Sequence, residues 1–353
     1  MRGIVVRGKL LRRRGWRAVL VAVTVLGLVV AGLSGVVVWQ NSYAMNVQRM
    51  TIREGGHELR AVLTTPEGGA RRHPLVVMVH GDGPTDATHE DGYQPIWEAF
   101  ARAGYASLSW DKPGVAGAPG NWLHQSMDDR ADEVAAAIAW ARSRPDIDGE
   151  RIGLWGASQA GWVMPKVAKR TGVAFVIAVA TAVNWLQQGR YNLLAELRQE
   201  HASAAEVKER IAKSDRTREL LRRGASYEEY VRAMGDGDGM TADRWGFIGR
   251  NYTADATDDL LALRGVPVLL FLGGLDVNVD SADTETVYRR QLEPGGALTV
   301  RNYPDADHSM VKGELVRSGL RLALTAIFAP RSLFAPHYLA DQENFLRGLR
   351  SRS

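Results

Sequence analysis

A chain of 353 residues has room for one large domain and an insertion, and its 45% hydrophobic and 24% charged residues are typical of a globular protein. It contains no cysteine, which excludes disulfides, thiolate metal sites and a cysteine nucleophile. The formal net charge of +4 comes from the N-terminus: residues 1–17 hold seven of the 44 basic residues and no acidic one, which leaves 37 basic against 40 acidic residues in the remainder. A nucleic-acid partner is therefore disfavoured, since it needs a basic face on the folded domain.

An uncharged apolar stretch follows this basic segment. Residues 18–38 form a run of 21 residues without a charge. As a helix the run would be about 31 Å long, which matches a bilayer core of about 30 Å. Trp16 and Trp39 stand at its two ends, where aromatic rings favour the membrane–water interface. We therefore predict a basic cytoplasmic segment at 1–17, a transmembrane anchor at 18–39, and the rest of the chain beyond the membrane.

A cleaved signal peptide is the alternative interpretation of this stretch. Ser42-Tyr43-Ala44 offers small residues where a signal peptidase cleaves, although the apolar core exceeds the usual length of about 7–15 residues. Both interpretations export the folded domain, which is membrane-tethered if the helix is retained and secreted if it is removed. The basic flank disfavours a third interpretation, a helix buried in the core.

The chain then alternates between strand and helix patterns. Residues 47–52 and 59–64 are β-branched apolar runs around Gly55-Gly56, which predicts an antiparallel hairpin. The continuous apolar run at 75–79 is typical of a strand buried on both faces. Further strands are expected at 105–110, 151–155, 173–179, 266–272 and 298–303, and helices at 95–102, from Ser126 to Pro145, at 162–170 and at 315–327.

This alternation predicts a mostly parallel sheet with helices on both faces. In such sheets ligands bind at the carboxyl ends of the strands. We expect the helix at 315–327 to complete the core and the amphipathic tail at 337–350 to pack on the body of the domain.

The segment Gly156-Ala157-Ser158-Gln159-Ala160-Gly161 links a predicted strand to a predicted helix. A serine at the tip of such a turn, with small residues two positions before and after it, is typical of a nucleophile elbow, because larger side chains would collide there. The helix that follows directs its first N–H groups and its positive dipole end toward whatever the serine attacks. The usual pattern has glycine where this chain has Ala160, which is still small. The alternative is a glycine-rich turn that carries an ordinary surface serine.

Residues 183–259 break the alternation, because helix formers and capping boxes replace the strand patterns. An insertion at this point of a parallel sheet lies beside Ser158, so we predict a helical cap; a solvated bundle that only pads the fold is the alternative. The segment 235–239 resembles a calcium loop. However, Met240 stands where an EF-hand needs an oxygen ligand, and the bidentate glutamate is missing, so a flexible turn is favoured.

Two more chemically competent residues follow strand patterns. Asp276 comes after the run at 266–272 and a Gly-Gly turn, and His308 comes after the run at 298–303. Ser158, Asp276 and His308 each follow a predicted buried strand, so we expect all three at one end of the sheet.

At this point the sequence resembles the α/β-hydrolase superfamily, whose chain order is nucleophile, acid, histidine. The resemblance covers roughly residues 45–330, with 183–259 as a variable cap. We therefore assign 45–182 and 260–353 to the hydrolase core. It implies the α/β-hydrolase fold, with a mostly parallel central sheet flanked by helices. The matching features are the elbow at 156–161, Gly273-x-x-Asp276, Pro304-x-x-x-His308 and the His80-Gly81 loop.

The resemblance implies acyl transfer through a covalent acyl-enzyme. His308 would take the proton of Ser158 and return it to the leaving group, while Asp276 would hold the imidazole tautomer. The oxyanion would be bound by the backbone N–H groups of Gln159 and Asp82. The Asp82 carboxylate must then point away from the oxyanion; otherwise Gly83 is the better donor.

Other polar residues near these motifs have simpler interpretations. His80 is expected to brace the oxyanion loop and Asp111 to brace a turn. Asp280 and Asp283 could replace Asp276, but they stand where a helix should begin and are expected to cap it. The group around His89 is interpreted as a polar loop rather than a metal site, and Asp305 and Asp307 lie too close to His308 in sequence to orient it. We expect no cofactor and no metal.

The branch that this pattern resembles most is that of dienelactone hydrolases and prolyl-oligopeptidase-like serine hydrolases, without the propeller-sized N-terminal domain of the latter. A serine at the elbow, where related dehalogenases and epoxide hydrolases have aspartate, favours ester, thioester or amide substrates. The leading hypothesis is an exported, membrane-tethered carboxylesterase for small esters. A peptidase, an acyltransferase and a non-catalytic binding protein on the same fold remain alternatives, and the oligomeric state is left open.

Overall fold

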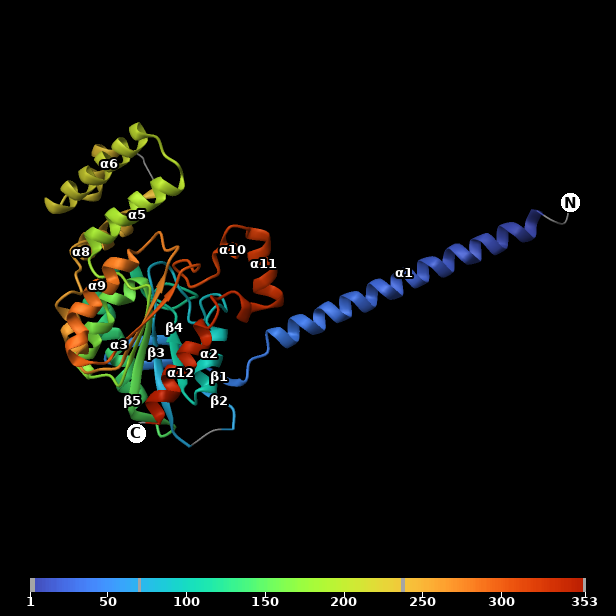
Figure 1. Cartoon of the computed structure of the whole chain (residues 1–353), viewed down its shortest axis with the longest axis horizontal. Coiled ribbons are helices and arrows are strands. Elements are labelled where there is room, and N and C mark those ends of the chain that lie inside the picture. The colour runs from blue at the N-terminus through green and yellow to red at the C-terminus, as the bar shows by residue number, and fades with distance from the viewer. Residues whose placement is uncertain (1–3, 69–70, 236–238, 352–353) are drawn as a thin grey trace.

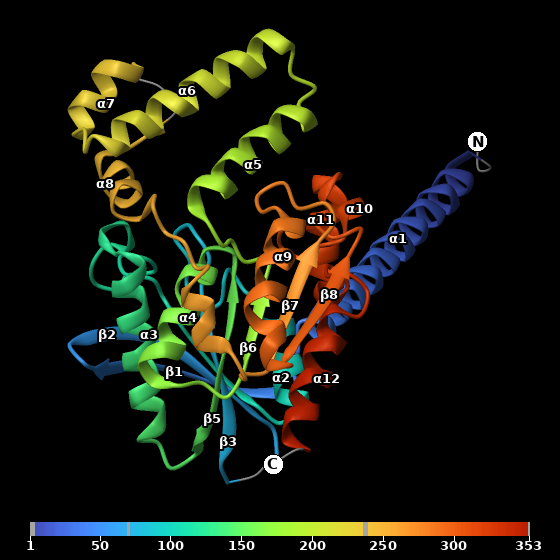
Figure 2. The same ribbon diagram turned by 60° about the vertical axis from the view of Figure 1, so that its left-hand side comes forward.

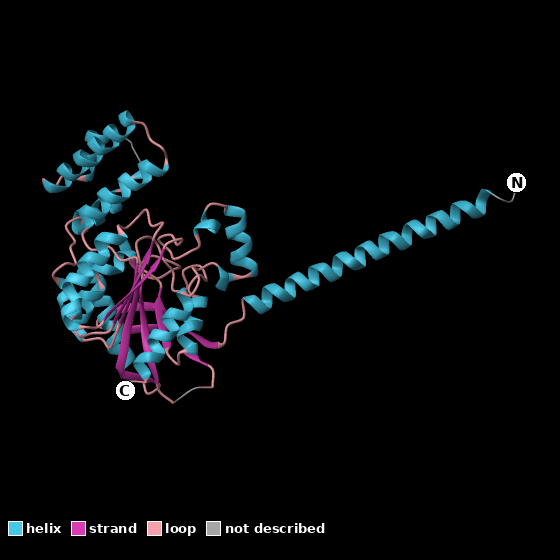
Figure 3. Cartoon of the chain, viewed as in Figure 1, coloured by secondary structure: helices cyan, strands magenta, loops and turns pink. Residues whose placement is uncertain are grey.

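The computed structural model describes residues 4–68, 71–235 and 239–351. Figures 1 and 3 show one body built from a sheet and its covering helices, a helical arm at one end of the sheet, and a long N-terminal helix that leaves the body. The body contains the residues of every catalytic motif named above.

The described residues form one eight-stranded sheet in the order β1-β2-β4-β3-β5-β6-β7-β8. The β1–β2 and β2–β4 pairs are antiparallel and all other neighbours are parallel, which confirms the expected mostly parallel sheet and the hairpin before it. The strands are β1 (Met45–Glu54), β2 (His57–Pro66), β3 (His73–Val79), β4 (Ala106–Trp110), β5 (Ile147–Ala157), β6 (Val176–Val179), β7 (Val268–Gly273) and β8 (Leu298–Tyr303).

The middle strands are buried on both faces because helices cover both sides of the sheet. Helices α3, α4 and α9 contribute to one apolar cluster, and α2 and α12 contribute to the cluster on the other face (Figure 2). The expected packing of the C-terminal tail is confirmed, since α12 buries Tyr338 and Leu346. These helices are α2 (Gln94–Arg102), α3 (Met127–Arg142), α4 (Met164–Thr171), α9 (Ser281–Leu292) and α12 (Tyr338–Arg350).

Two expectations about the last part of the chain were wrong. Strand β8 lies at the edge of the sheet and is only half-buried, because it has one strand neighbour and carries the charged Arg301. The helix expected at 315–327 is broken into α10 (Gly313–Val316) and α11 (Gly319–Phe328), because Ser318 adopts an extended conformation and its hydroxyl caps α11. None of the described residues of α11 is buried, so this helix does not complete the core.

In the segment 183–259, every described element longer than one turn is a helix. Its two ends are held together, because Trp185 N donates to Ala254 O (2.9 Å) and Ala256 N donates to Val183 O (2.9 Å). It therefore leaves and re-enters the core at one place, as an insertion does. Its helices are α5 (Trp185–Gln199), α6 (Ala204–Arg222), α7 (Tyr227–Met234) and α8 (Ala242–Asn251); the calcium-like segment 235–239 falls largely on residues 236–238, which lie outside the described residues.

The N-terminal helix α1 (Ile4–Gln40) extends away from the body (Figure 1). Within it, the 22-residue stretch Val19–Gln40 contains an 18-residue window that has a mean hydropathy of 2.5 and is not buried by the rest of the protein. By length and composition this stretch is able to cross a membrane.

Candidate active site

The turn after β5 has the geometry that the elbow pattern predicts. Ser158 has a φ of +54°, a strained conformation for a residue with a side chain. A Cβ atom on Gly156 would lie 2.6 Å from Ala160 Cβ, and one on Gly161 would lie 2.4 Å from Ala182 O. The small residues are therefore required by close packing around the turn, which holds the serine at the carboxyl end of the sheet.

The loop after β3 runs beside Ser158. Strands β3 and β5 pair with Val79 opposite Gly156, so the residues that follow each strand lie side by side. A Cβ atom on Gly81 would lie 3.4 Å from both Ala157 O and Ser158 Cβ. This close approach brings the backbone of the 80–83 loop to the serine.

A buried lysine fixes the peptide plane in this loop. Lys112 Nζ donates to Gly81 O (2.6 Å) and to Gly83 O (2.8 Å). In a trans peptide the carbonyl and the next N–H point in opposite directions, so the N–H of Asp82 points away from Lys112. Burial lowers the pKa of Lys112 well below its usual value, and the nearby Arg130 lowers it further.

A chain of hydrogen bonds ties the loop to the elbow and to α8. Arg130 Nη2 donates to His80 O (2.6 Å) and its Nη1 donates to Gln159 Oε1 (2.5 Å). Gln159 Nε2 donates to Asp82 Oδ1 (3.2 Å), and Arg244 binds both oxygens of the Asp82 carboxylate (2.9 and 2.6 Å). The carboxylate of Asp82 is therefore directed toward Arg244 and the Gln159 side chain. Burial alone would raise the pKa of Asp82, but the hydrogen bonds and charge of Arg244 outweigh it and lower the pKa.

His80 is fully engaged beneath the loop. Its Nε2–H donates to Trp110 O (2.7 Å), which leaves Nδ1 to accept from the Tyr93 hydroxyl (3.1 Å). Burial, followed by the charge of Lys112, lowers the pKa of His80 to about 3. The ring is neutral and braces the loop, as expected, rather than taking part in proton transfer.

The acid and the histidine form a direct pair. Asp276 Oδ2 accepts from His308 Nδ1 (2.7 Å), and Asp276 Oδ1 accepts from the backbone N–H groups of Asn278 and Val279 (2.8 Å each). The carboxylate is buried, whereas His308 is partly exposed and lines the same cavity as Ser158. With Nδ1 donating, His308 Nε2 carries a free lone pair in the neutral ring.

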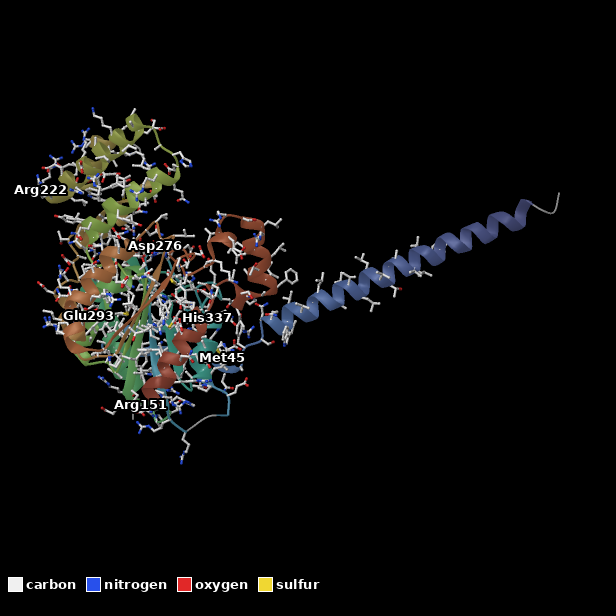
Figure 4. All side chains as sticks on the ribbon, in the orientation of Figure 1. Met45, Arg151, Arg222, Asp276, Glu293 and His337 are labelled. Carbon is white, nitrogen blue, oxygen red and sulfur yellow. The ribbon has the colours of Figure 1, made fainter. Side chains whose placement is uncertain are left out.

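The turns that carry Asp276 and His308 pack tightly against each other. A Cβ atom on Gly273 would lie 2.5 Å from Asp307 O, and one on Gly274 would lie 2.4 Å from Pro304 O. These glycines set the separation of the two turns. In Figure 4, Asp276 lies at the end of the sheet nearest the helical arm, and Arg151 lies at the opposite end.

The alternative residues have structural partners. Asp280 caps α9 through the N–H groups of Ala282 and Asp283, as expected. Asp307 accepts from Ser309 N and Val311 N, and burial raises the pKa of Asp307. Asp111 accepts from Ala87 N (2.8 Å) and so braces the loop after His80. Among the described residues, no group of acidic or histidine side chains could hold a metal ion.

A cavity of about 670 Å³ joins Ser158 and His308. One side is aromatic and is formed by Tyr93, Trp155, Phe334 and Tyr338. The other side is formed by Trp162 and by residues of α5 and α8; among the described lining residues none comes from α6 or α7. Tyr191 of α5 also donates to Asp276 O (2.8 Å), which links the insertion to the acid turn.

Three cations of this site were missed in the sequence analysis: Lys112, Arg130 and Arg244. Lys112 follows the carboxyl end of β4, and ligand sites of parallel sheets lie at the carboxyl ends of the strands. Its position in the sequence could therefore have indicated a role in the site. Arg130 lies three residues after the buried Met127, and Arg244 lies three residues before the buried Phe247, so both share the apolar faces of their helices. Their partners depend on tertiary packing, which this spacing does not reveal.

The comparisons with known proteins agree with this geometry. The sequence matches the family described as X-Pro dipeptidyl-peptidase (S15 family) over residues 55–303, more than half of the chain. It is 23% identical over 256 residues to "Esterase EstD" of Thermotoga maritima, covering 71% of this chain and 58% of that protein. It is 33% identical over 108 residues to "Quorum-quenching protein AidA" of Acinetobacter baumannii, covering 30% of this chain and 34% of that protein. The chain thus spans less than two thirds of the length of these curated relatives.

Solved structures share the fold at low sequence identity. The α/β hydrolase GrgF from a Penicillium species superposes with a TM-score of 0.54 at 16% identity, covering 87% of this chain and 99% of that one. Est1E from Butyrivibrio proteoclasticus, solved with ferulic acid, gives 0.53 at 15% identity, covering 86% and 98%. These matches confirm the α/β-hydrolase fold.

The burial of neutral His80 predicts a pH dependence of stability. Its pKa is about 3 in the folded protein and about 6.5 in an unfolded chain, so the unfolded state binds the proton first as the pH falls. We expect the free energy of unfolding of wild type to fall by about 2–3 kcal/mol more than that of His80→Asn between pH 7.5 and pH 4.5. Urea unfolding of both proteins at the two pH values measures this difference, and equal losses in both would contradict a buried neutral ring.

Proposed function

This chain belongs to the S15 family of X-Pro dipeptidyl-peptidases and is a serine hydrolase, and we propose that it cleaves carboxylic esters through an acyl-enzyme on Ser158. The observation that carries the proposal is the hydrogen bond between the buried Asp276 and His308, because His308 lines one cavity with a strained serine at the end of β5. A serine with an ordinary structural role has no need of this arrangement.

In the proposed mechanism His308 Nε2 removes the proton of Ser158 as its oxygen attacks the ester carbonyl. Asp276 stabilises the imidazolium that forms and holds the tautomer through its 2.7 Å hydrogen bond. The histidine then gives the proton to the alcohol oxygen as the C–O bond breaks, which leaves an acyl group on Ser158. Water activated by the same histidine releases the acid and restores the serine.

The proposed oxyanion donors are the backbone N–H groups of Gln159 and Asp82. The hold of Lys112 on Gly81 O supports the second donor, because it turns the N–H of Asp82 to the other side of the peptide. The Asp82 carboxylate is paired with Arg244, so its negative charge does not oppose the oxyanion. Asp82 therefore suits this role better than Gly83. One such donor typically stabilises the transition state by about 3–4 kcal/mol.

The family description names a dipeptidyl-peptidase, which is the second candidate function. An enzyme that releases dipeptides must bind a free N-terminal ammonium, and a carboxylate in the site would do this best. Among the described residues that line the cavity, Asp82 is the only carboxylate, and Arg244 already binds both of its oxygens. The aromatic wall and the size of the cavity suit a small apolar ester better, and the name of the Thermotoga relative supports the same choice.

We also propose that α1 is retained as a membrane anchor, with residues 1–17 in the cytoplasm and the hydrolase domain beyond the membrane. Arg331 donates to Gln40 O (2.5 Å) and to Ser42 O (2.8 Å), and Asn41 Nδ2 donates to Ile327 O (2.9 Å). Cleavage after Ala44 would remove all three contacts. We further propose that 183–259 acts as a cap, since α5 and α8 contribute residues to the wall of the cavity.

Labelling with a fluorophosphonate tests the nucleophile. We expect wild type to be labelled and Ser158→Ala to remain unlabelled, because the activated hydroxyl is the group that attacks phosphorus. Gel fluorescence measures the labelling. Folded wild-type protein that stays unlabelled, or a mutant that labels equally, would overturn the assignment of Ser158.

Substrate comparison separates the two candidate activities. We expect p-nitrophenyl esters of short acids to be hydrolysed with a kcat/KM at least about 100-fold above that of Xaa-Pro p-nitroanilides, because the cavity offers no unpaired carboxylate to an ammonium group. Release of the nitrophenol and nitroaniline chromophores measures both. A preference for the Xaa-Pro anilides would favour the dipeptidyl-peptidase.

Two aspartates four residues apart allow a matched test of the acid. Asp276→Asn should lower kcat by about 10⁴-fold, because the amide favours the wrong histidine tautomer. Asp280→Asn should leave kcat within about twofold, since Asp280 caps α9 and asparagine also caps helices well. Ester hydrolysis at saturating substrate measures both; equal losses would contradict the assignment of Asp276.

A further inference from the structure

Helix α11 presents an apolar face to the surroundings of the molecule. Leu320, Leu324 and Ile327 are 72%, 46% and 49% exposed, and their spacing of four and three residues puts them on one side of the helix. Arg321 is the only charged residue between Gly319 and Phe328. A contiguous apolar face of this kind marks an interaction surface rather than a scattered exposed residue.

This face lies next to the end of the apolar helix α1. Helix α11 contacts α1, and Asn41 Nδ2, just after α1, donates to Ile327 O (2.9 Å). Figures 1 and 2 both show α10 and α11 beside the point where α1 meets the body. Val38 and Trp39, at this same end of α1, are also exposed.

A partly buried ion pair fixes α1 and α11 relative to the body. Arg331, which follows α11, binds the Glu98 carboxylate (2.6 and 2.9 Å) and the carbonyl oxygens of Gln40 and Ser42. The Tyr43 ring stacks on the same guanidinium at 4.4 Å. Burial would raise the pKa of Glu98, but the hydrogen bonds from Arg331 outweigh it and lower the pKa. The helices are thus held in one orientation by groups that stay charged at neutral pH.

We propose that the α11 face, defined by Leu320, Leu324 and Ile327, docks on the lipid bilayer beside the anchor α1. The bilayer is the occupant that fits, because α1 carries a 22-residue stretch that is long and apolar enough to cross a membrane, and this stretch, the proposed anchor, ends next to α11. A helix with an apolar face lies in the plane of the membrane interface, with that face at the boundary between the head groups and the acyl chains. The face thus continues the surface that α1 presents to lipid.

The docked helix shares its base with the substrate cavity. Val311 and Phe334 flank α10 and α11 in the chain, form a β-bridge with each other, and both line the cavity together with Leu333. Docking therefore sets the apolar wall of the cavity close to the lipid. On the basis of the proposed esterase function, we infer that the substrates are amphiphilic esters that partition into the membrane.

The absence of cysteine makes the docking directly measurable. The full chain carrying Leu320→Cys is labelled with an environment-sensitive fluorophore and reconstituted in vesicles of phosphatidylcholine and phosphatidylglycerol that contain brominated phosphatidylcholine. The matched control is Leu261→Cys, which is 41% exposed and lies in a short helix that packs on α4 and α9.

We expect brominated lipid to quench the label at 320 strongly and to leave the label at 261 unchanged, because only the first lies among acyl chains. Equal, weak quenching at both positions would overturn the docking. If the label at 320 is shielded from water but not quenched by lipid, and this shielding grows with protein concentration, the face binds a second copy of the chain. That result would also overturn docking on the bilayer.

Kinetics test the substrate class separately. The double variant Leu320→Ser/Leu324→Ser should hydrolyse a water-soluble acetate ester at the wild-type rate, because neither leucine lines the cavity. It should hydrolyse a vesicle-embedded long-chain ester about tenfold more slowly, because the two serines lose the free energy that the leucines gain from burial in lipid. Equal rates on the embedded ester would overturn the substrate class. If wild type hydrolyses neither ester while lipid still quenches the label at 320, the esterase proposal fails and the docking stands.

Discussion

Two buried cations beneath the 80–83 loop are the constraint on which the site depends. Lys112 holds the carbonyl oxygens of Gly81 and Gly83, and Arg130 holds that of His80. Burying charge is costly, and it is tolerated where hydrogen bonds and counter-charges offset the lost hydration. Here the offset comes from the loop carbonyls and from the nearby carboxylates of Asp82 and Glu133. The same bonds that satisfy the cations fix the direction of the loop N–H groups.

This arrangement links regions that are distant in sequence. Arg244 of α8 binds Asp82 in the loop after β3, and Gln159 of the elbow binds both Asp82 and Arg130. The insertion also reaches the acid turn through Tyr191. Because the elbow, the loop and the insertion share these bonds, a change in the position of α8 alters the loop beside Ser158 as well as the cavity wall.

The sequence was sufficient for features that local chemistry determines. The strand–helix alternation, the elbow glycines and the order of Ser158, Asp276 and His308 depend on periodicity and close packing, which the residue types reveal directly. The role of Arg244 could not be predicted, because its partner Asp82 lies 162 residues away. The break at Ser318 was missed since an apolar run favours a continuous helix, and only the cap and the contact with α1 distinguish α11 from a core helix.

Observation of an acyl-enzyme tests the proposed role of Ser158 most directly. Wild-type protein mixed with excess p-nitrophenyl butyrate and quenched in acid within the first turnovers is examined by intact-protein and peptide mass spectrometry. We predict an increase by the mass of one butyryl group, located on the peptide that contains Ser158. Ester hydrolysis without any acyl adduct, or with the adduct on another residue, would contradict it.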